Sequence, residues 1–164
     1  MTSSPFVFPV SDVLSDSGSW RAVEVDAPIA WGFEMAAVGP HLKADLVLEN
    51  ASGVLVVRGP AETALQLTCH RCLTVWTETL SVEITEALGF DDDGDGYALE
   101  RDTADLEPVL RDALLLEVPL RPMCRDDCRG LCATCGADLN TATCPGHDEE
   151  SILPFAALRD LLEP

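Results

Sequence analysis

Basic residues are scarce in this chain. Only 10 lysines and arginines stand against 29 aspartates and glutamates in 164 residues, which gives a formal net charge of −19. A protein that docks broadly on phosphate backbones needs many basic side chains to neutralise them. The scarcity therefore disfavours a broad nucleic-acid interface. It favours a basic protein as partner, or contact with nucleic acid through one local patch.

Long apolar runs and catalytic motifs are also missing. No stretch approaches the roughly 18 apolar residues that a membrane-spanning helix needs. The start of the chain lacks the basic and apolar regions of a signal peptide, so we expect a cytoplasmic protein. No glycine-rich phosphate loop and no serine-centred nucleophile elbow is present. A hydrophobic content of 47% nevertheless allows a real core, which excludes a disordered acidic tail.

What the chain does contain is cysteine in pairs. Five of the seven cysteines lie in the segment 124–147, and the other two are Cys69 and Cys72. Free cysteines mostly behave as scattered, small buried hydrophobes. Here each has another ligand-type residue three or four positions away, which is typical of metal sites. An odd number of cysteines also fits poorly with a closed disulfide framework.

The spacing divides these residues and one histidine into two sets of four. The sets are Cys69, Cys72, Cys124 and Cys128, and Cys132, Cys135, Cys144 and His147. The second set has spacings that a tetrahedral zinc accepts, and the first is inferred by elimination. We therefore predict two structural zinc ions. A Cys₆His arrangement with shared ligands, and a single zinc with Cys69 and Cys72 unused, are the alternatives. Four protein ligands leave no open position for a catalytic water, so we predict no enzymatic activity.

Alternating hydrophobicity dominates the middle of the chain. Apolar and polar residues alternate in 20–25, 42–48, 63–69 and 76–87, which is the period of half-buried strands, and the segment 54–58 is expected to form a further strand. Turn signals at 50–53 and at Gly59-Pro60 separate these segments. Closely spaced strands with short turns predict an antiparallel meander of five or six strands. Cys69 and Cys72 would then lie at the bend between two paired strands.

The rest of the chain predicts a loop, a helix and a metal module. Residues 89–105 are rich in aspartate and predict an exposed acidic loop. A helix is expected near 105–118, and a last helix is expected to begin at Ser151. The predicted fold is α+β: an antiparallel β-meander sheet with one packed helix and a C-terminal cysteine-rich zinc module followed by a short helix. We place residues 1–120 in the sheet domain and 121–164 in the zinc module, packed on the first as one unit.

Four arginines lie in or beside the cysteine motifs, namely Arg71, Arg121, Arg125 and Arg129. One interpretation is a small cationic partner-binding spot suited to a phosphate or a carboxylate. The other is that they offset the negative charge of a zinc held by four thiolates. Both interpretations can hold for different arginines.

Three motifs together resemble the YceD family, also called the large ribosomal RNA subunit accumulation protein family. They are Cys-x-Arg-Cys-Leu at 69–73, Glu-Val-Pro-Leu at 117–120 and Cys-Arg-Gly-Leu-Cys-x-x-Cys-Gly-Ala-Asp-Leu-Asn at 128–140. The resemblance carries over to the first six cysteines, whereas Cys144 and His147 rest on spacing. It implies a bacterial, cytoplasmic, non-enzymatic factor needed for normal levels of large-subunit ribosomal RNA. It also implies a gene that commonly neighbours that of a small zinc-ribbon protein of the large subunit.

The resemblance and the charge together predict a ribosome biogenesis factor. We expect it to bind a basic protein of the large ribosomal subunit or a pre-ribosomal particle, with local RNA contact at most and no membrane contact. The alternatives are a zinc-dependent RNA-processing enzyme and a zinc-stapled adaptor without a ribosomal role.

Overall fold

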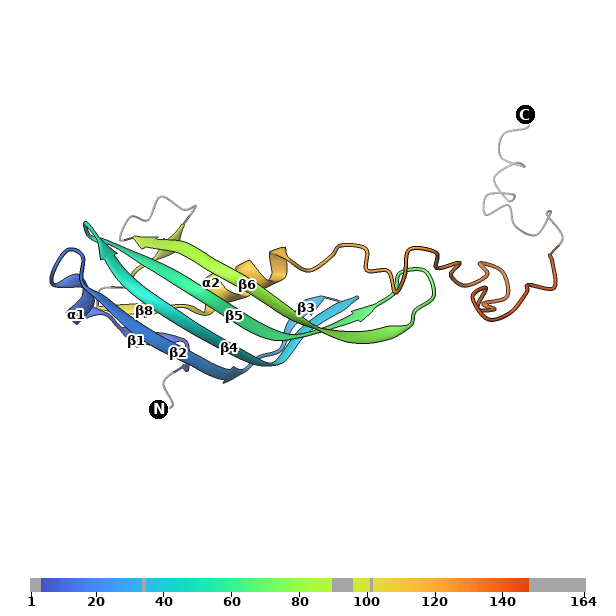
Figure 1. Ribbon diagram of the computed structural model, residues 1–164, viewed down its shortest axis with the longest axis horizontal. Helices are drawn as coiled ribbons and strands as arrows, with labels where there is room; N and C mark the ends of the chain where they lie inside the picture. The colour runs from blue at the N-terminus through green and yellow to red at the C-terminus, as the bar shows by residue number, and fades with distance from the viewer. Residues whose placement is uncertain (1–3, 34, 90–95, 101, 148–164) are drawn as a thin grey trace, which may run out of the picture.

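The computed structural model describes residues 4–33, 35–89, 96–100 and 102–147 (Figure 1). Its strands are β1 (Val7–Pro9), β2 (Trp20–Pro28), β3 (Trp31–Phe33), β4 (Ala36–Ala51), β5 (Val54–Thr68), β6 (Val75–Gly89), β7 (Tyr97–Ala98) and β8 (Thr103–Asp105). Its helices are α1 (Ser11–Leu14) and α2 (Glu107–Leu116). No helix in these ranges is long and apolar enough to cross a membrane.

A six-stranded sheet forms the body of the molecule. Its strand order is β2-β4-β5-β6-β7, and β3 pairs with the beginning of β4. The pairs among β2, β4, β5 and β6 are antiparallel, as the alternating pattern predicts, whereas the short β6–β7 pair is parallel. Figure 1 shows the sheet at one end of an elongated molecule and the cysteine-rich segment at the other. The hairpin of β5 and β6 connects the two ends.

The predicted strand break at Gly59-Pro60 is wrong. β5 runs without interruption through both residues, which face Ile84 and Glu83 of β6. Gly59 has a φ of +140°, and a Cβ built on it would lie 2.1 Å from the carbonyl oxygen of Asp45. The glycine therefore marks a close approach of two backbones inside the sheet, which is the other common reason for glycine in a strand.

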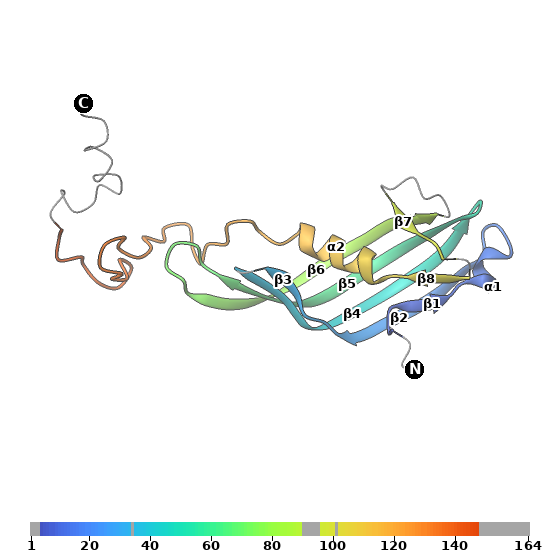
Figure 2. The same ribbon diagram turned by 180° about the vertical axis from the view of Figure 1, so that it is seen from behind.

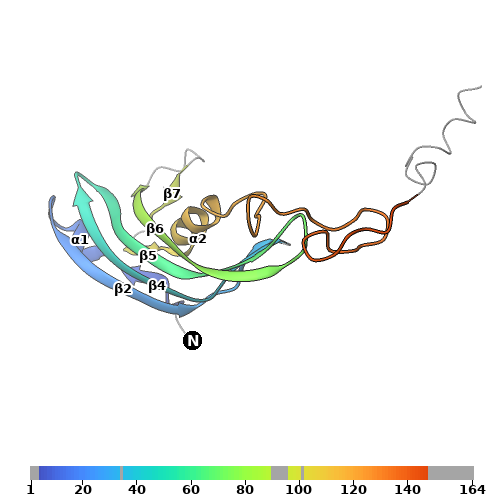
Figure 3. The same ribbon diagram turned by 45° about the vertical axis from the view of Figure 1, so that its right-hand side comes forward.

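One face of the sheet carries the core. Leu46 and Leu48 of β4 and Leu55 of β5 are completely or almost completely buried, and Leu110 and Leu114 of α2 belong to the same cluster. α2 contacts β6 and β3, and it lies over the inner face of the curved sheet (Figure 3). The helix ends at Leu116, eight residues before Cys124.

The expectation of a continuous exposed loop over 89–105 is also wrong in its second half. Residues 97–98 and 103–105 form strands, and β8 pairs with β1. Leu99 and Ala104 are buried in the core: the Leu99 amide donates to the Gly89 carbonyl at the end of β6, and Ala104 lies opposite Phe8 of β1. The acidic run from Asp91 to Asp95 and the helix predicted to begin at Ser151 lie outside the described residues. The division of the chain between residues 120 and 121 stays a prediction.

Candidate metal centres

The turn between β5 and β6 presents the first two cysteines. The Leu73 amide donates to the Cys69 carbonyl at 2.9 Å, and the Cys69 amide donates to the Thr74 carbonyl at 2.9 Å. Leu73 has a φ of +60°, which lets the chain turn back within a few residues. Cys69 is fully buried and Cys72 is 9% exposed, although both lie at the tip of a long hairpin. Something must therefore cover this tip.

The segment that follows α2 covers it. The His70 amide donates to the Pro122 carbonyl at 3.0 Å, and the Leu131 amide donates to the Arg71 carbonyl at 2.9 Å. The Arg71 guanidinium donates to the Cys128 carbonyl at 2.9 Å. These three hydrogen bonds join the hairpin tip to both ends of the segment 122–131. They fix the backbone that carries Cys124 and Cys128.

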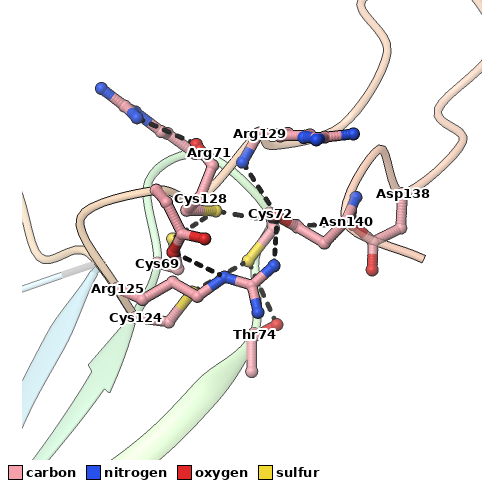
Figure 4. A network of polar contacts seen from close by, with 11 residues as sticks. Cys69, Arg71, Cys72, Thr74, Cys124, Arg125, Cys128, Arg129, Asp138 and Asn140 are labelled. Carbon is pink, nitrogen blue, oxygen red and sulfur yellow. Dashed lines mark hydrogen bonds and ion pairs between the residues drawn. The ribbon is translucent and has the colours of Figure 1, made fainter. Parts of the chain in front are cut away.

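Four sulfur atoms meet at this junction (Figure 4). The Sγ atoms of Cys69 and Cys128 are 3.9 Å apart, and those of Cys72 and Cys124 are 3.6 Å apart. All four sulfurs lie within 4.8 Å of one another. A tetrahedron with metal–sulfur distances of about 2.3 Å has edges of about 3.8 Å. The four cysteines of the first predicted set could therefore hold one metal ion.

The electrostatics of this group favour a cation. Burial raises the pKa of Cys69, but the backbone around Cys124, Cys72 and Arg71 outweighs burial and lowers it to about 6. Loss of hydration and the neighbouring thiols raise the pKa of Cys124 to about 12. Crowded thiols oppose one another's ionisation because like charges repel. A divalent cation at the centre supplies the missing positive charge and favours the thiolate form of all four.

The second group lies farther along the same segment. The Gly136 amide donates to the Cys132 carbonyl at 2.8 Å, and the Cys132 amide donates to the Ala137 carbonyl at 2.8 Å. Gly136 has a φ of +72°, so the loop turns back after two cysteines, as the hairpin tip does. Cys132 is partly buried and Cys135 is exposed. This group is the more accessible of the two.

Its ligand atoms are also close together. The Cys132 and Cys144 sulfurs are 3.6 Å apart, and His147 Nε2 lies 3.2 Å from the first and 3.0 Å from the second. The Cys135 sulfur lies 4.0 Å from that of Cys144. Backbone hydrogen bonding at Cys135 lowers the pKa of Cys132 to about 6, which favours its thiolate. This group also could hold a metal ion.

Asn140 links the two groups, and the sequence analysis gave it no role. Its side-chain NH₂ donates to the Cys128 sulfur at 3.7 Å and to the Asp138 carboxylate at 2.7 Å. Its side-chain oxygen accepts from the Arg129 amide and from the Arg125 guanidinium, each at 2.8 Å. Through these bonds, the loop that carries the second group helps to position the Cys128 thiol of the first group (Figure 4). The only sequence signal was the asparagine that ends the 128–140 motif.

The four arginines separate into two kinds. The Arg71 guanidinium donates to the Cys128 carbonyl, and the Arg125 guanidinium donates to the side-chain oxygen of Asn140. These two arginines therefore stabilise the chain around the first group. Arg125 also pairs with the Asp127 carboxylate at 3.3 Å. Arg121 and Arg129 are exposed, and within the described residues their side chains make no ion pair. Arg71 and Arg125 therefore lie where they could offset the charge of a metal held by four thiolates, and Arg121 and Arg129 remain available for a partner contact.

Comparison with known proteins gives a family match over most of this region. The family model described as "Large ribosomal RNA subunit accumulation protein YceD" matches residues 57–162, a stretch that contains all eight predicted ligands. No solved structure gives a significant match.

Three relatives illustrate the range of similarity. An uncharacterized protein of Mycobacterium tuberculosis is 36% identical over 151 residues, covering 85% of this chain and 72% of the relative. One of Mycobacterium leprae is 31% identical, covering 98% of this chain and 79% of the relative. A Zea mays protein called "Large ribosomal RNA subunit accumulation protein YCED homolog 1, chloroplastic" is 40% identical over 54 residues, covering 31% of this chain and 18% of the relative.

Proposed function

Because this chain belongs to the YceD family of large ribosomal RNA subunit accumulation proteins, we propose that it supports the accumulation of large-subunit ribosomal RNA. The family match is the observation that carries the proposal, since it spans both cysteine groups and most of the β5–β6 hairpin that carries Cys69 and Cys72. The name of the maize relative describes the same role for that protein.

Each cysteine group holds one zinc ion in this proposal. Thiolate and imidazole ligands at tetrahedral distances suit zinc better than magnesium or calcium, which prefer oxygen. From residue 121 to 147, all of which the structure describes, Pro122 and Cys128 are the only side chains that are buried. Such a segment cannot obtain its folding free energy from apolar burial. Metal binding would supply that free energy.

The zinc ions act structurally rather than catalytically. Four ligands close each coordination sphere, whereas a catalytic zinc keeps an open position for water or substrate. The protein would therefore act by binding a partner in the cytoplasm. A basic protein of the large ribosomal subunit is the proposed partner, because a net charge of −19 attracts a basic protein and repels naked RNA at long range. RNA contact would be confined to Arg121 and Arg129.

The proposal is tested in cells that lack the gene. Large-subunit ribosomal RNA should fall relative to small-subunit RNA, and the wild-type chain should restore it. Tagged wild-type protein should retain basic large-subunit proteins from extract with and without ribonuclease, and higher salt should weaken this retention. Unchanged ribosomal RNA levels would exclude the function. Retention that depends on RNA and is lost in the Arg121→Gln, Arg129→Gln double variant would assign the contact to RNA instead.

Replacing Asn140 should weaken the first metal centre. In Asn140→Ala the Cys128 sulfur loses a hydrogen-bond donor and the Arg129 amide loses its acceptor. Loss of a group that orients a metal ligand typically costs about 10- to 100-fold in metal affinity. Competition with a chromophoric zinc chelator should show one weakened site. Thr141→Val is the control, because among the described residues the Thr141 hydroxyl hydrogen-bonds only to Asp138. Equal zinc affinities in both variants would remove Asn140 from this role.

A further inference from the structure

β6 has a long unpaired edge. On one side it pairs with β5 from Val75 to Leu88. On the other side it pairs with β7 only at Leu88 and Gly89, and in the described part of the chain no strand covers the edge from Val75 to Ala87. Every second backbone N–H and C=O of this edge therefore points away from the sheet. Figure 2 shows β6 at the rim of the sheet, beside α2.

A groove of about 390 Å³ follows this edge. Its walls are Ser81, Val82, Glu83 and Glu86 of β6, and Ala113, Leu116 and Glu117 at the end of α2. Successive side chains of a strand point to opposite faces of the sheet. A groove that touches both Val82 and Glu83 therefore runs along the strand edge rather than over one face. The unpaired backbone groups of β6 and the groove therefore lie along the same part of the strand.

The groove combines an apolar wall with acidic rims. Val82 and Ala113 are only partly buried, and Leu116 is 84% exposed, so apolar surface is available for contact. Glu83, Glu86 and Glu117 place three carboxylates on the lining, which contains no lysine or arginine. β6 itself has three glutamates and no basic residue in its whole length. A strand that pairs with this edge is therefore favoured if it carries positive charge.

We propose that the β6 edge binds an extended, lysine- and arginine-rich polypeptide segment as an added strand. Main-chain hydrogen bonds to the edge provide the attachment, as in other cases of strand addition. Alternate side chains of the added strand then reach Glu83 on one face, and Glu86 with the apolar wall at Val82 and Leu116 on the other. The proposal rests on the proposed function, because it specifies how a basic ribosomal protein is held.

Charge decides against the other occupants. A second copy of the chain would bring its own glutamates against Glu83 and Glu86, and like charges on neighbouring strands are destabilising. Nucleic acid would bring phosphates against three carboxylates. The chain's own residues 148–164 contain five acids and one arginine, a net charge of −4 from 5 negative and 1 positive residues. Only a basic segment complements this edge.

The test uses the full-length protein and a fluorescent 12-residue peptide of alternating lysine and valine. The peptide should bind, and hydrogen exchange should slow at alternate amides between Val75 and Ala87. An analogue with N-methyl groups on both edges of the peptide cannot donate main-chain hydrogen bonds from either edge and should lose binding. Binding of both peptides with equal affinity would overturn strand addition. Protection of these amides before any peptide is added would mean that the chain's own tail or a second copy covers the edge, which also overturns the proposal.

Charge reversal separates this inference from the proposed function. The Glu83→Lys, Glu86→Lys variant should bind the peptide about tenfold or more weakly, because two rim contacts change sign. Glu24→Lys, Asp45→Lys is the control, since it makes the same charge change at an exposed cross-strand pair on β2 and β4. Both variants are then used to retain basic large-subunit proteins from extract. Equal retention by both would overturn the β6 site and leave the proposed function intact, whereas no retention by the wild type would overturn the proposed partner itself.

Discussion

Cys69→Ser should lose one of two metal ions and release the segment 121–131 from the hairpin tip. Cys69 is fully buried between the tip and this segment, and its sulfur lies 3.9 Å from that of Cys128. A structural zinc contributes about 10 kcal/mol or more to the folding of a small metal module. Three remaining ligands retain only part of that free energy. The amides of His70 and Leu131, which bridge the two segments, should exchange about a hundredfold faster.

Native mass spectrometry and hydrogen exchange check this expectation. The wild type should carry two zinc ions, and Cys69→Ser should carry one, held by Cys132, Cys135, Cys144 and His147. Cys135→Ser is the matched variant: it should also carry one ion but keep the slow exchange of the Leu131 amide. A Cys69→Ser protein that keeps both ions would exclude the cross-chain set. One ion in the wild type would support the alternative in which Cys69 and Cys72 are unused.

The sequence permitted the grouping of ligands because metal geometry restricts spacing along the chain. Cys132, Cys135, Cys144 and His147 are near in sequence, and the structure brings them together. The Cys69–Cys128 neighbourhood spans 59 residues and was inferred only by elimination. Asn140 could not be found in this way. An asparagine beside a cysteine has many possible roles, and its bonds to Cys128 and Arg129 depend on how two loops pack.

The sequence also could not predict that the edge of β6 is unpaired. Alternation identified β6 as a strand, and alternation depends on which face is buried rather than on which edges are paired. The parallel pairing with β7 stops at Leu88 and Gly89, and this limit depends on the path of the chain after β6. Edge availability is a property of topology. It became visible only when the strand order was known.

Gly59 shows a different kind of error. A glycine in this position can mark a turn, or it can mark a close approach of two backbones inside a sheet. Glycine followed by proline usually marks a turn, and the strand was expected to end there. In the structure the pair lies inside β5, between Val57 and Ala61, which are both fully buried. The glycine is needed because the backbone of β4 passes too close for a side chain. A direct test follows from this difference.

Gly59→Ala should destabilise the protein by about 3–5 kcal/mol, the combined cost of a positive φ for alanine and of a steric overlap in a packed sheet. The added Cβ would lie 2.1 Å from the Asp45 carbonyl oxygen, and neither backbone can move without shifting a central strand. Gly53→Ala is the control. Gly53 also has a positive φ, +93°, but in the described part of the chain no atom outside residues 52–54 lies within 4 Å of its Cβ position, so its cost should be about 1 kcal/mol.

Urea unfolding of the zinc-loaded proteins, followed by tryptophan fluorescence, measures both costs on one scale. Two zinc ions per chain in each folded variant would show that the metal centres are intact and that the difference arises in the sheet. The excess loss in Gly59→Ala over Gly53→Ala then reports mainly the overlap, together with any difference in backbone strain between alanine at +140° and at +93°. Equal losses would mean that β4 and β5 can separate at Asp45 without cost. The close approach would then not be what requires glycine in the middle of β5.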